Sequence, residues 1–203
     1  MKVWIAACSL LALVASECHA SGNVLDAALK GTVMQFMDGG RVSGCGVGLQ
    51  AIETGVGPNG TAHLFSGAIA LMGRNGGIVR GSLATTPGDK LLAGDIGSLQ
   101  EQTLKMVWVK APGQPATALR PGEEVSKSDT PGVISYVAEL TPLASALFAV
   151  QFGKPLQIGA RTEKANQDVI LAGVVAMSDA QRQQLGQCIR EFTEYVERSE
   201  SGK

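Results

Sequence analysis

Aromatic residues and histidines are scarce in this chain of 203 residues. Phe, Trp and Tyr together account for 4% of the sequence, which contains two histidines. Sugar-binding and single-strand-binding surfaces are built from aromatic ring faces, so the composition argues against both. A zinc site needs three or four ligands, and no pair of His or Cys residues has ligand spacing here. We therefore expect no bound metal and no other cofactor.

Neither positive nor negative charge is present in excess. The chain has 17 basic and 18 acidic residues, which gives a formal net charge of −1. Proteins that bind nucleic acid or an anionic membrane surface carry a basic patch. We therefore expect no nucleic acid among the partners. Glycine, in contrast, is abundant at 26 residues without a strict repeat, which is typical of tight turns and bulged strands.

The first twenty residues have the layout of a secretory signal peptide. Lys2 supplies a positive start, residues 3–14 are almost entirely apolar, and a small residue, Ala20, ends the segment. The apolar run is too short to span a bilayer, and no second such run follows. We predict that residues 1–20 are removed by cleavage after Ala20. Residues 21–203 are then a single exported domain, in the bacterial periplasm or outside the cell.

A lipid anchor is the alternative fate of this leader, because it contains two cysteines. Cys18 follows Glu17, where the lipidation signal needs a small residue. Cys8 lies too near the start to leave a full apolar segment before it. We therefore expect no stable membrane anchor after cleavage.

Two cysteines, Cys45 and Cys188, remain beyond the leader. Exported chains with an even number of cysteines usually bridge them. Alternation along 42–52 places Cys45 on the apolar face of a predicted strand. Helical spacing places Cys188 on the apolar stripe of a predicted C-terminal helix. We predict a disulfide between them, and the alternative is two buried thiols that act as small hydrophobic side chains.

The N-terminal half predicts an antiparallel meander. Apolar, β-branched segments alternate with glycine-rich turns at 38–40 and 73–77. The predicted strands cover 32–37, 42–52, 63–72, 78–84 and 103–110. A short helix is predicted over 23–29, from apolar residues at helical spacing. Residues 89–102 are interpreted as loop with a short helical turn.

The C-terminal half begins with a proline-rich loop at 111–131. Beyond it, strands are predicted at 133–140, 156–161 and 169–177. A first helix is expected from Thr141, as its N-cap, to Gly153, and a second over 179–198. Ser178 and Gln181 predict a capping box at the start of the second. The expected fold class is α+β, with a mainly antiparallel sheet of about seven to eight strands packed by two helices, the longer at the C-terminus.

Candidate catalytic residues are few, and we assign none. His63 could form a thiol–imidazole dyad with Cys45, but a bridge to Cys188 would abolish it. Carboxylate pairs of the glycosidase type come together only in the fold, and solvated loop charge is the simpler interpretation. The clustered carboxylates are Asp89, Asp95, Glu101, Glu123 and Glu124. The glycines of 44–48 lack the spacing of a dinucleotide fingerprint and the lysine of a P-loop, so we interpret them as strand geometry.

These features favour an exported, non-enzymatic binding or accessory protein. Its partner would be another envelope or secreted protein, recognised through protein–protein contacts. Two alternatives remain open. One is a small-ligand carrier with an apolar pocket between the sheet and the final helix. The other is an exported hydrolase with Cys–His or carboxylate chemistry.

Overall fold

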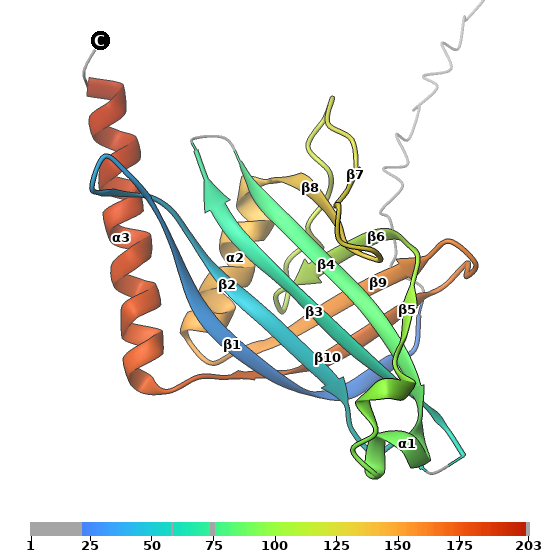
Figure 1. The fold of residues 1–203 in the computed structure, drawn as a ribbon. Helices are drawn as coiled ribbons and strands as arrows, with labels where there is room; N and C mark the ends of the chain where they lie inside the picture. Colours follow the sequence, from blue (N-terminus) through green and yellow to red (C-terminus); the bar gives the residue numbers. More distant parts are fainter. Residues whose placement is uncertain (1–21, 58, 74–75, 202–203) are drawn as a thin grey trace, which may run out of the picture.

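The computed structural model describes residues 22–57, 59–73 and 76–201. The predicted signal peptide, residues 1–20, lies outside the described residues. A single ten-stranded sheet forms the body of the protein, with the spatial order β6-β9-β10-β1-β2-β3-β4-β8-β7 and β5 paired to β4 (Figure 1). The strands are β1 (Val24–Asp38), β2 (Arg41–Glu53), β3 (Thr61–Met72), β4 (Gly76–Pro87), β5 (Gln100–Gln102), β6 (Leu104–Lys110), β7 (Ser126–Lys127), β8 (Ile134–Glu139), β9 (Pro155–Thr162) and β10 (Asp168–Ala176).

The fold class is α+β, as predicted. All strand pairs are antiparallel except β1 with β10, which is parallel. The helices are α1 (Gly88–Leu92), α2 (Leu140–Gln151) and α3 (Asp179–Ser201), with a 3-10 turn, η1 (Ile96–Ser98). Two short strands, β5 and β7, account for most of the difference from the expected strand count, because their brief pairings leave little periodicity in the sequence.

The predicted helix over 23–29 is wrong. These residues form the first half of β1, where Val24 pairs with Ile170 and Lys30 with Ala176 of β10. From Ala27 onward, the strand also pairs with β2 on its other side. Hydrogen bonding to two neighbouring strands overrides the weak helical spacing of four apolar residues.

The β1–β2 hairpin closes through the predicted glycine turn. Asp38 pairs with Arg41, and the two residues between them, Gly39 and Gly40, have φ angles of 54° and 78°. Two consecutive positive φ angles are what a primed two-residue turn requires, and glycine adopts them without a steric penalty.

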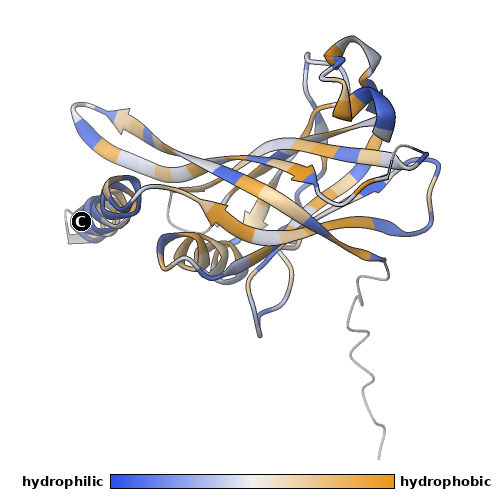
Figure 2. Ribbon diagram, turned by 90° about the horizontal axis from the view of Figure 1, so that it is seen from below, coloured by the Kyte–Doolittle hydropathy of each residue, from blue (hydrophilic) through white to orange (hydrophobic). Residues whose placement is uncertain are grey.

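Both long helices cover the same face of the sheet, which we call the inner face. Figure 2 shows them together on one side of the strands. Buried inward-facing residues of β2, including Val47 and Leu49, belong to the same hydrophobic cluster as Leu143 of α2 and Leu185 of α3. The core therefore lies between the inner face and the two helices.

The ends of the helices match the sequence predictions in two of three places. Ser178 and Gln181 form the predicted capping box, with reciprocal bonds of 2.8 and 3.2 Å. Gly153 has a φ of 63° just after α2, as expected of a C-terminal glycine. Thr141 is not the N-cap, because α2 begins at Leu140, two residues before the predicted start, and Glu139 takes the cap position without a side-chain bond.

A segment of the proline-rich loop bridges two strands that are distant in the sheet order. Thr117 N–H donates to the carbonyl of Val109 in β6, at 2.8 Å. Three residues later, Arg120 N–H donates to the carbonyl of Val137 in β8, at 2.9 Å. Loop 111–131 therefore links the β6 edge to the β8 edge, and the sheet curls around α2.

Candidate functional site

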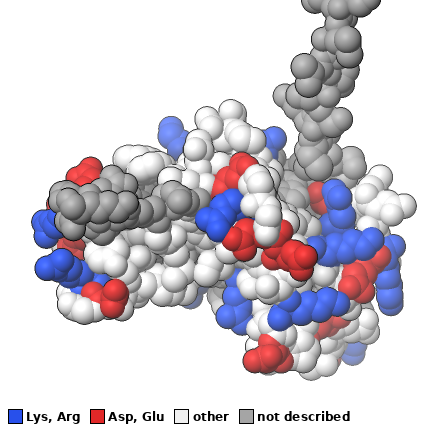
Figure 3. Space-filling view, turned by 90° about the horizontal axis from the view of Figure 1, so that it is seen from above, with Lys and Arg blue, Asp and Glu red and all other residues white. Residues whose placement is uncertain are grey.

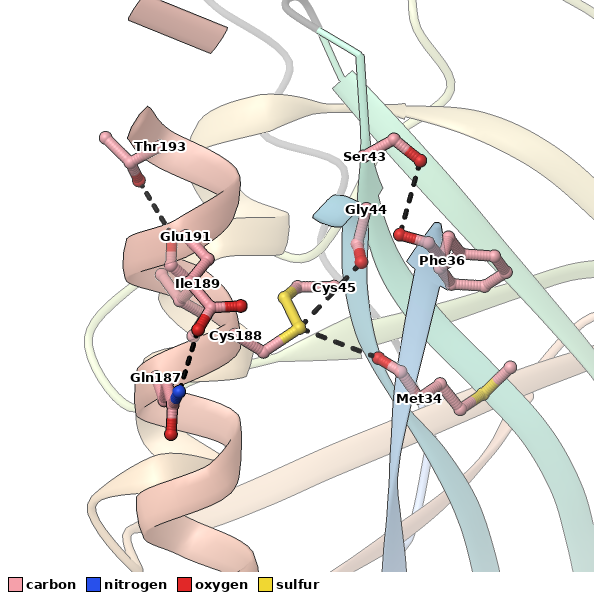
Figure 4. The surroundings of a disulfide bond; sticks show 10 residues. All are labelled: Met34, Phe36, Ser43, Gly44, Cys45, Gln187, Cys188, Ile189, Glu191 and Thr193. Atoms are coloured by element: carbon pink, nitrogen blue, oxygen red, sulfur yellow. Dashed lines mark hydrogen bonds between the residues drawn. A yellow bond between two sulfur atoms is a disulfide. The ribbon is translucent and has the colours of Figure 1, made fainter. Parts of the chain in front are cut away.

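The two cysteines lie side by side, as the alternation along strand 42–52 and the helical spacing of the C-terminal helix predicted. Cys45 of β2 and Cys188 of α3 form a disulfide, with their Cα atoms 5.8 Å apart and a sequence separation of 143 (Figure 4). Both residues are fully buried. The bond fastens the middle of α3 to the inner face of the β1–β2 hairpin, and it leaves no thiol at Cys45.

His63 lies far from Cys45. Cys45 pairs with Leu71 of β3, and His63 is eight residues away along that strand, which corresponds to roughly 26 Å. His63 instead contacts Glu53, with Nδ1 2.6 Å from Oε2, and its backbone N–H donates to the same oxygen at 3.2 Å. The dyad considered from the sequence is therefore absent, and His63 fastens the end of β3 to β2.

The candidate carboxylates do not converge. Asp95 accepts a bond from Gly97 N–H at 3.1 Å and lies 3.8 Å from Lys90 Nζ. Glu123 pairs with Arg120, on a different loop. Within the part of the chain that the structure describes, no group of three or more His, Cys, Asp or Glu side chains could hold a metal ion.

Two of the three glycines at 44–48, Gly44 and Gly46, allow β2 and β3 to pack closely, in keeping with their interpretation as strand geometry. A Cβ atom on Gly46 would lie 2.4 Å from the carbonyl oxygen of Ile69 in β3. The backbones of β2 and β3 approach each other here more closely than a side chain would allow.

A buried polar cluster, which no pattern in the sequence indicated, lies on the outer face of the sheet, opposite the inner face. Trp108 Nε1–H donates to Asp168 Oδ2 at 2.9 Å, and Arg161 Nε–H donates to Asp168 Oδ1 at 2.6 Å. Asp168 is 5% exposed. The three residues come from β6, β9 and β10, so only the strand pairing brings them together. Both oxygens of the carboxylate already accept hydrogen bonds, so the cluster links strands β6, β9 and β10 and is not a ligand site.

Tyr136 of β8 is a second buried polar group. Its hydroxyl lies 3.0 Å from Thr117 Oγ1, which also accepts a bond from Val109 N–H at 3.0 Å. Burial raises the pKa of Tyr136 to about 12, and the hydrogen bond with Thr117 offsets part of that increase. The phenol therefore helps to hold β6 and β8 together and stays protonated at neutral pH.

The predicted pocket between the sheet and the final helix is occupied by side chains. Leu185, Cys188 and Phe192 of α3 are buried in the hydrophobic core. An open groove of about 580 Å³ lies at the base of the helix instead, where β10 leaves the sheet. Its lining includes Ala28, Lys30, Gln50, Ile52, Ala176, Met177, Ser178 and Gln181.

Among the described residues, the two most exposed large aliphatic side chains lie on one loop. Residues 88–99, which we call the 88–99 loop, contain α1 and η1 and project from the end of β4 (Figure 1). Leu92 is 71% exposed and Ile96 is 81% exposed. A second exposed pair, Phe148 and Phe152, stacks along α2 with ring centroids 6.4 Å apart.

Charges are mixed over the surface. On the face in Figure 3, lysine and arginine side chains alternate with acidic ones, without a broad region of one sign. Neither long helix, over the described residues, combines enough length and apolarity to cross a bilayer. The chain matched no protein family model, no curated protein and no solved structure.

Proposed function

We propose that this chain is an exported accessory protein that binds another envelope or secreted protein through the 88–99 loop. The observation that carries the proposal is the exposure of Leu92 and Ile96 on a segment that is fixed in place. Exposed aliphatic side chains are unfavourably solvated by water, and transferring them into a partner's apolar pocket is favourable.

The loop is held by its own hydrogen bonds. Ser98 Oγ donates to the carbonyl of Asp95 at 2.7 Å and lies 2.6 Å from Thr86 Oγ1 of β4. Asp95 N–H donates to the carbonyl of Lys90 at 2.9 Å. A loop that is already ordered loses little conformational entropy when it binds, so its apolar contacts contribute more fully to affinity.

The charges on the loop favour a protein partner over a lipid surface. Asp89, Lys90 and Asp95 are the only charged residues of 88–99, and they sum to −1. Segments that insert into anionic membranes carry clustered lysine or arginine beside their apolar residues. This loop would be repelled by an anionic surface.

Export rests on two independent features. The first twenty residues have the composition of a cleavable leader. The Cys45–Cys188 disulfide is compatible with an oxidising compartment, where such bonds persist. Together they support an envelope or extracellular protein as the partner.

Site-specific photo-crosslinking in cells tests the proposal. A photoreactive residue is introduced at Leu92 in the full chain, and at Val174 as the control, because Val174 is also exposed but lies on β10. We expect one protein adduct from the envelope fraction at position 92 and none at 174. Equal adducts at both positions, or adducts with lipid alone, would overturn the proposal.

Binding by the crosslinked partner then provides the quantitative test. Leu92→Ser and Ile96→Ser should each weaken its affinity by about tenfold or more, as truncation of an interface anchor does. Val174→Ser is the matched control and should leave affinity unchanged. All three positions are exposed, so folding stability should change by less than about 0.5 kcal/mol. N-terminal sequencing of the exported protein should begin at Ser21.

A further inference from the structure

The loop between β2 and β3 contains an Asn–Gly dipeptide, Asn59–Gly60. The sequence has one other, Asn75–Gly76, whose asparagine lies outside the described residues. Asn59 is exposed, and its side chain forms no hydrogen bond within the part of the chain that the structure describes. Its amide group is therefore free to approach the backbone nitrogen of the next residue.

This approach leads to a chemical change at Asn59. The backbone nitrogen of Gly60 gives up its proton to solvent and attacks Cγ of Asn59, and the side-chain nitrogen leaves as ammonia. Water then opens the cyclic imide at one of its two carbonyl carbons. Opening at Cγ gives aspartate, and opening at the backbone carbonyl carbon gives isoaspartate, in which the main chain runs through Cβ and Cγ.

The residue that follows the asparagine decides how readily the ring closes. Glycine has no Cβ atom to obstruct the attack, and its backbone adopts the required conformation without a steric penalty. Asn23 and Asn166 are also exposed, but they precede Val24 and Gln167. Both of these successors carry a Cβ atom, so Asn59 is the described asparagine most open to the reaction.

The product would form directly against the base of the 88–99 loop. Gly88, the first residue of α1, donates its N–H to the carbonyl of Gly60 at 2.8 Å. A Cβ atom on Gly88 would lie 2.2 Å from the carbonyl oxygen of Gly57. The two backbones are therefore in contact, with no space to absorb a longer main chain at residue 59.

We propose that Asn59 is a site of spontaneous deamidation, and that its isoaspartate product releases Gly88 and loosens the 88–99 loop. The additional methylene in the main chain displaces the carbonyl of Gly60, so the hydrogen bond to Gly88 is lost. The consequence for binding rests on the proposed function of the loop. A loop that is less fixed loses more conformational entropy when it binds, so older molecules would bind the partner more weakly.

The structure also sets the pace of the reaction. Gly60 N–H donates to the carbonyl of Gly57 at 2.9 Å, and this bond has to open before the nitrogen attacks. Local opening of a surface loop is frequent but brief. The modification is therefore slow, and it accumulates with the age of the molecule.

Peptide mapping of the purified protein, incubated in mildly alkaline buffer, tests the site. We expect the mass increase of an NH₂-to-OH replacement at Asn59, and enzymatic methylation specific for isoaspartate in the same peptide. Trypsin cuts after Arg74, which separates Asn59 from Asn75. Asn23 and Asn166 are the internal controls and should stay unmodified. An unmodified Asn59, or equal modification of Asn59 and the two controls, would overturn the proposal.

Hydrogen exchange at the Gly88 amide tests the effect on the loop. The protein carries Asn75→Gln, so that only residue 59 changes on incubation. The Gly88 amide should exchange about fivefold faster or more in the isoaspartate form, as expected for the loss of one hydrogen bond. Asn59→Gln, incubated alongside, and freshly prepared Asn59→Asp, which adds the charge without lengthening the main chain, should keep the original rate. Unchanged exchange in the isoaspartate form, or equally fast exchange in Asn59→Asp, would overturn the proposed release of Gly88.

Neither measurement requires the partner of the 88–99 loop. Leu92→Ser should alter neither the deamidation of Asn59 nor the exchange of Gly88. Failure of crosslinking at Leu92 would therefore remove the binding role and leave the modification in place. Absence of product at Asn59 would remove the modification and leave the binding role in place.

Discussion

The indole N–H of Trp108 reaches the carboxylate of Asp168 across the backbone of β9. The bond is 2.9 Å long and joins residues separated by 60 positions. Gly159 makes it possible, since a Cβ atom there would lie 2.0 Å from Cε2 of the indole. One glycine thus provides the space for the ring, and the ring in turn positions the hydrogen bond.

Removing the carboxylate should be costly. Asp168→Ala leaves the buried indole N–H without its acceptor and removes the ion pair between Asp168 and Arg161. We expect a loss of about 2–3 kcal/mol in the free energy of unfolding, measured by urea denaturation. Glu163→Ala is the control, since Glu163 forms an exposed pair with Lys127 at 3.4 Å. Glu163→Ala should lower the free energy of unfolding by less than about 0.5 kcal/mol. Equal losses in the two variants would contradict the role of Asp168 in linking the strands.

Adding one methyl group beneath the ring should have a similar effect. Gly159→Ala forces Trp108 away from β9, and overpacking of this kind costs about 1–3 kcal/mol. The indole N–H should then exchange with solvent faster, as NMR would detect. Gly57→Ala is the matched control, because nothing lies within 4 Å of a Cβ at Gly57. An unchanged exchange rate in Gly159→Ala would mean that the ring is not held by Asp168.

The disulfide should account for a large share of the stability. Cross-linking a loop of 143 residues restricts the unfolded chain, and the chain-entropy model gives about 5 kcal/mol, of which engineered cases often realise less. We expect Cys45→Ser/Cys188→Ser to lose roughly 3–5 kcal/mol in urea denaturation. Chemical reduction of the unmodified protein should reproduce the loss. Titration of the native protein should find no free thiol at either residue.

Local patterns predicted what depends on local geometry. Alternation in β2 and helical spacing in α3 were enough to place Cys45 and Cys188 on facing surfaces. The Ser178–Gln181 capping box could be predicted because its two residues lie within one helical turn of each other in the sequence. The strand at 24–30 was missed, because its state depends on β10, which lies more than 140 residues further along the chain.

The surface proposed for function was beyond the reach of sequence periodicity. Leu92 and Ile96 are ordinary aliphatic residues until the fold leaves them exposed. Asp168 lies just before the strand predicted over 169–177, and only the pairing of three strands reveals it as a buried acceptor.

Alkaline pH should destabilise the protein through Tyr136. The pKa of its phenol rises from 10.0 to about 12 on folding, because burial disfavours the phenolate. Between those values the unfolded chain releases the proton and the folded protein keeps it, so stability falls as pH rises through this window. Two pKa units correspond to about 2–3 kcal/mol.

Tyr136→Phe isolates this contribution. Below pH 9 the variant should be less stable by about 1 kcal/mol, since it lacks the hydrogen bond between the phenol and Thr117. As the pH rises from 10 to 12, the unmodified protein should lose stability relative to the variant, and the order of the two should reverse. Titration of lysines affects both proteins alike and cancels in the difference between their urea midpoints. A difference that stays constant up to pH 12 would mean that the phenol ionises as readily in the folded protein as in the unfolded chain.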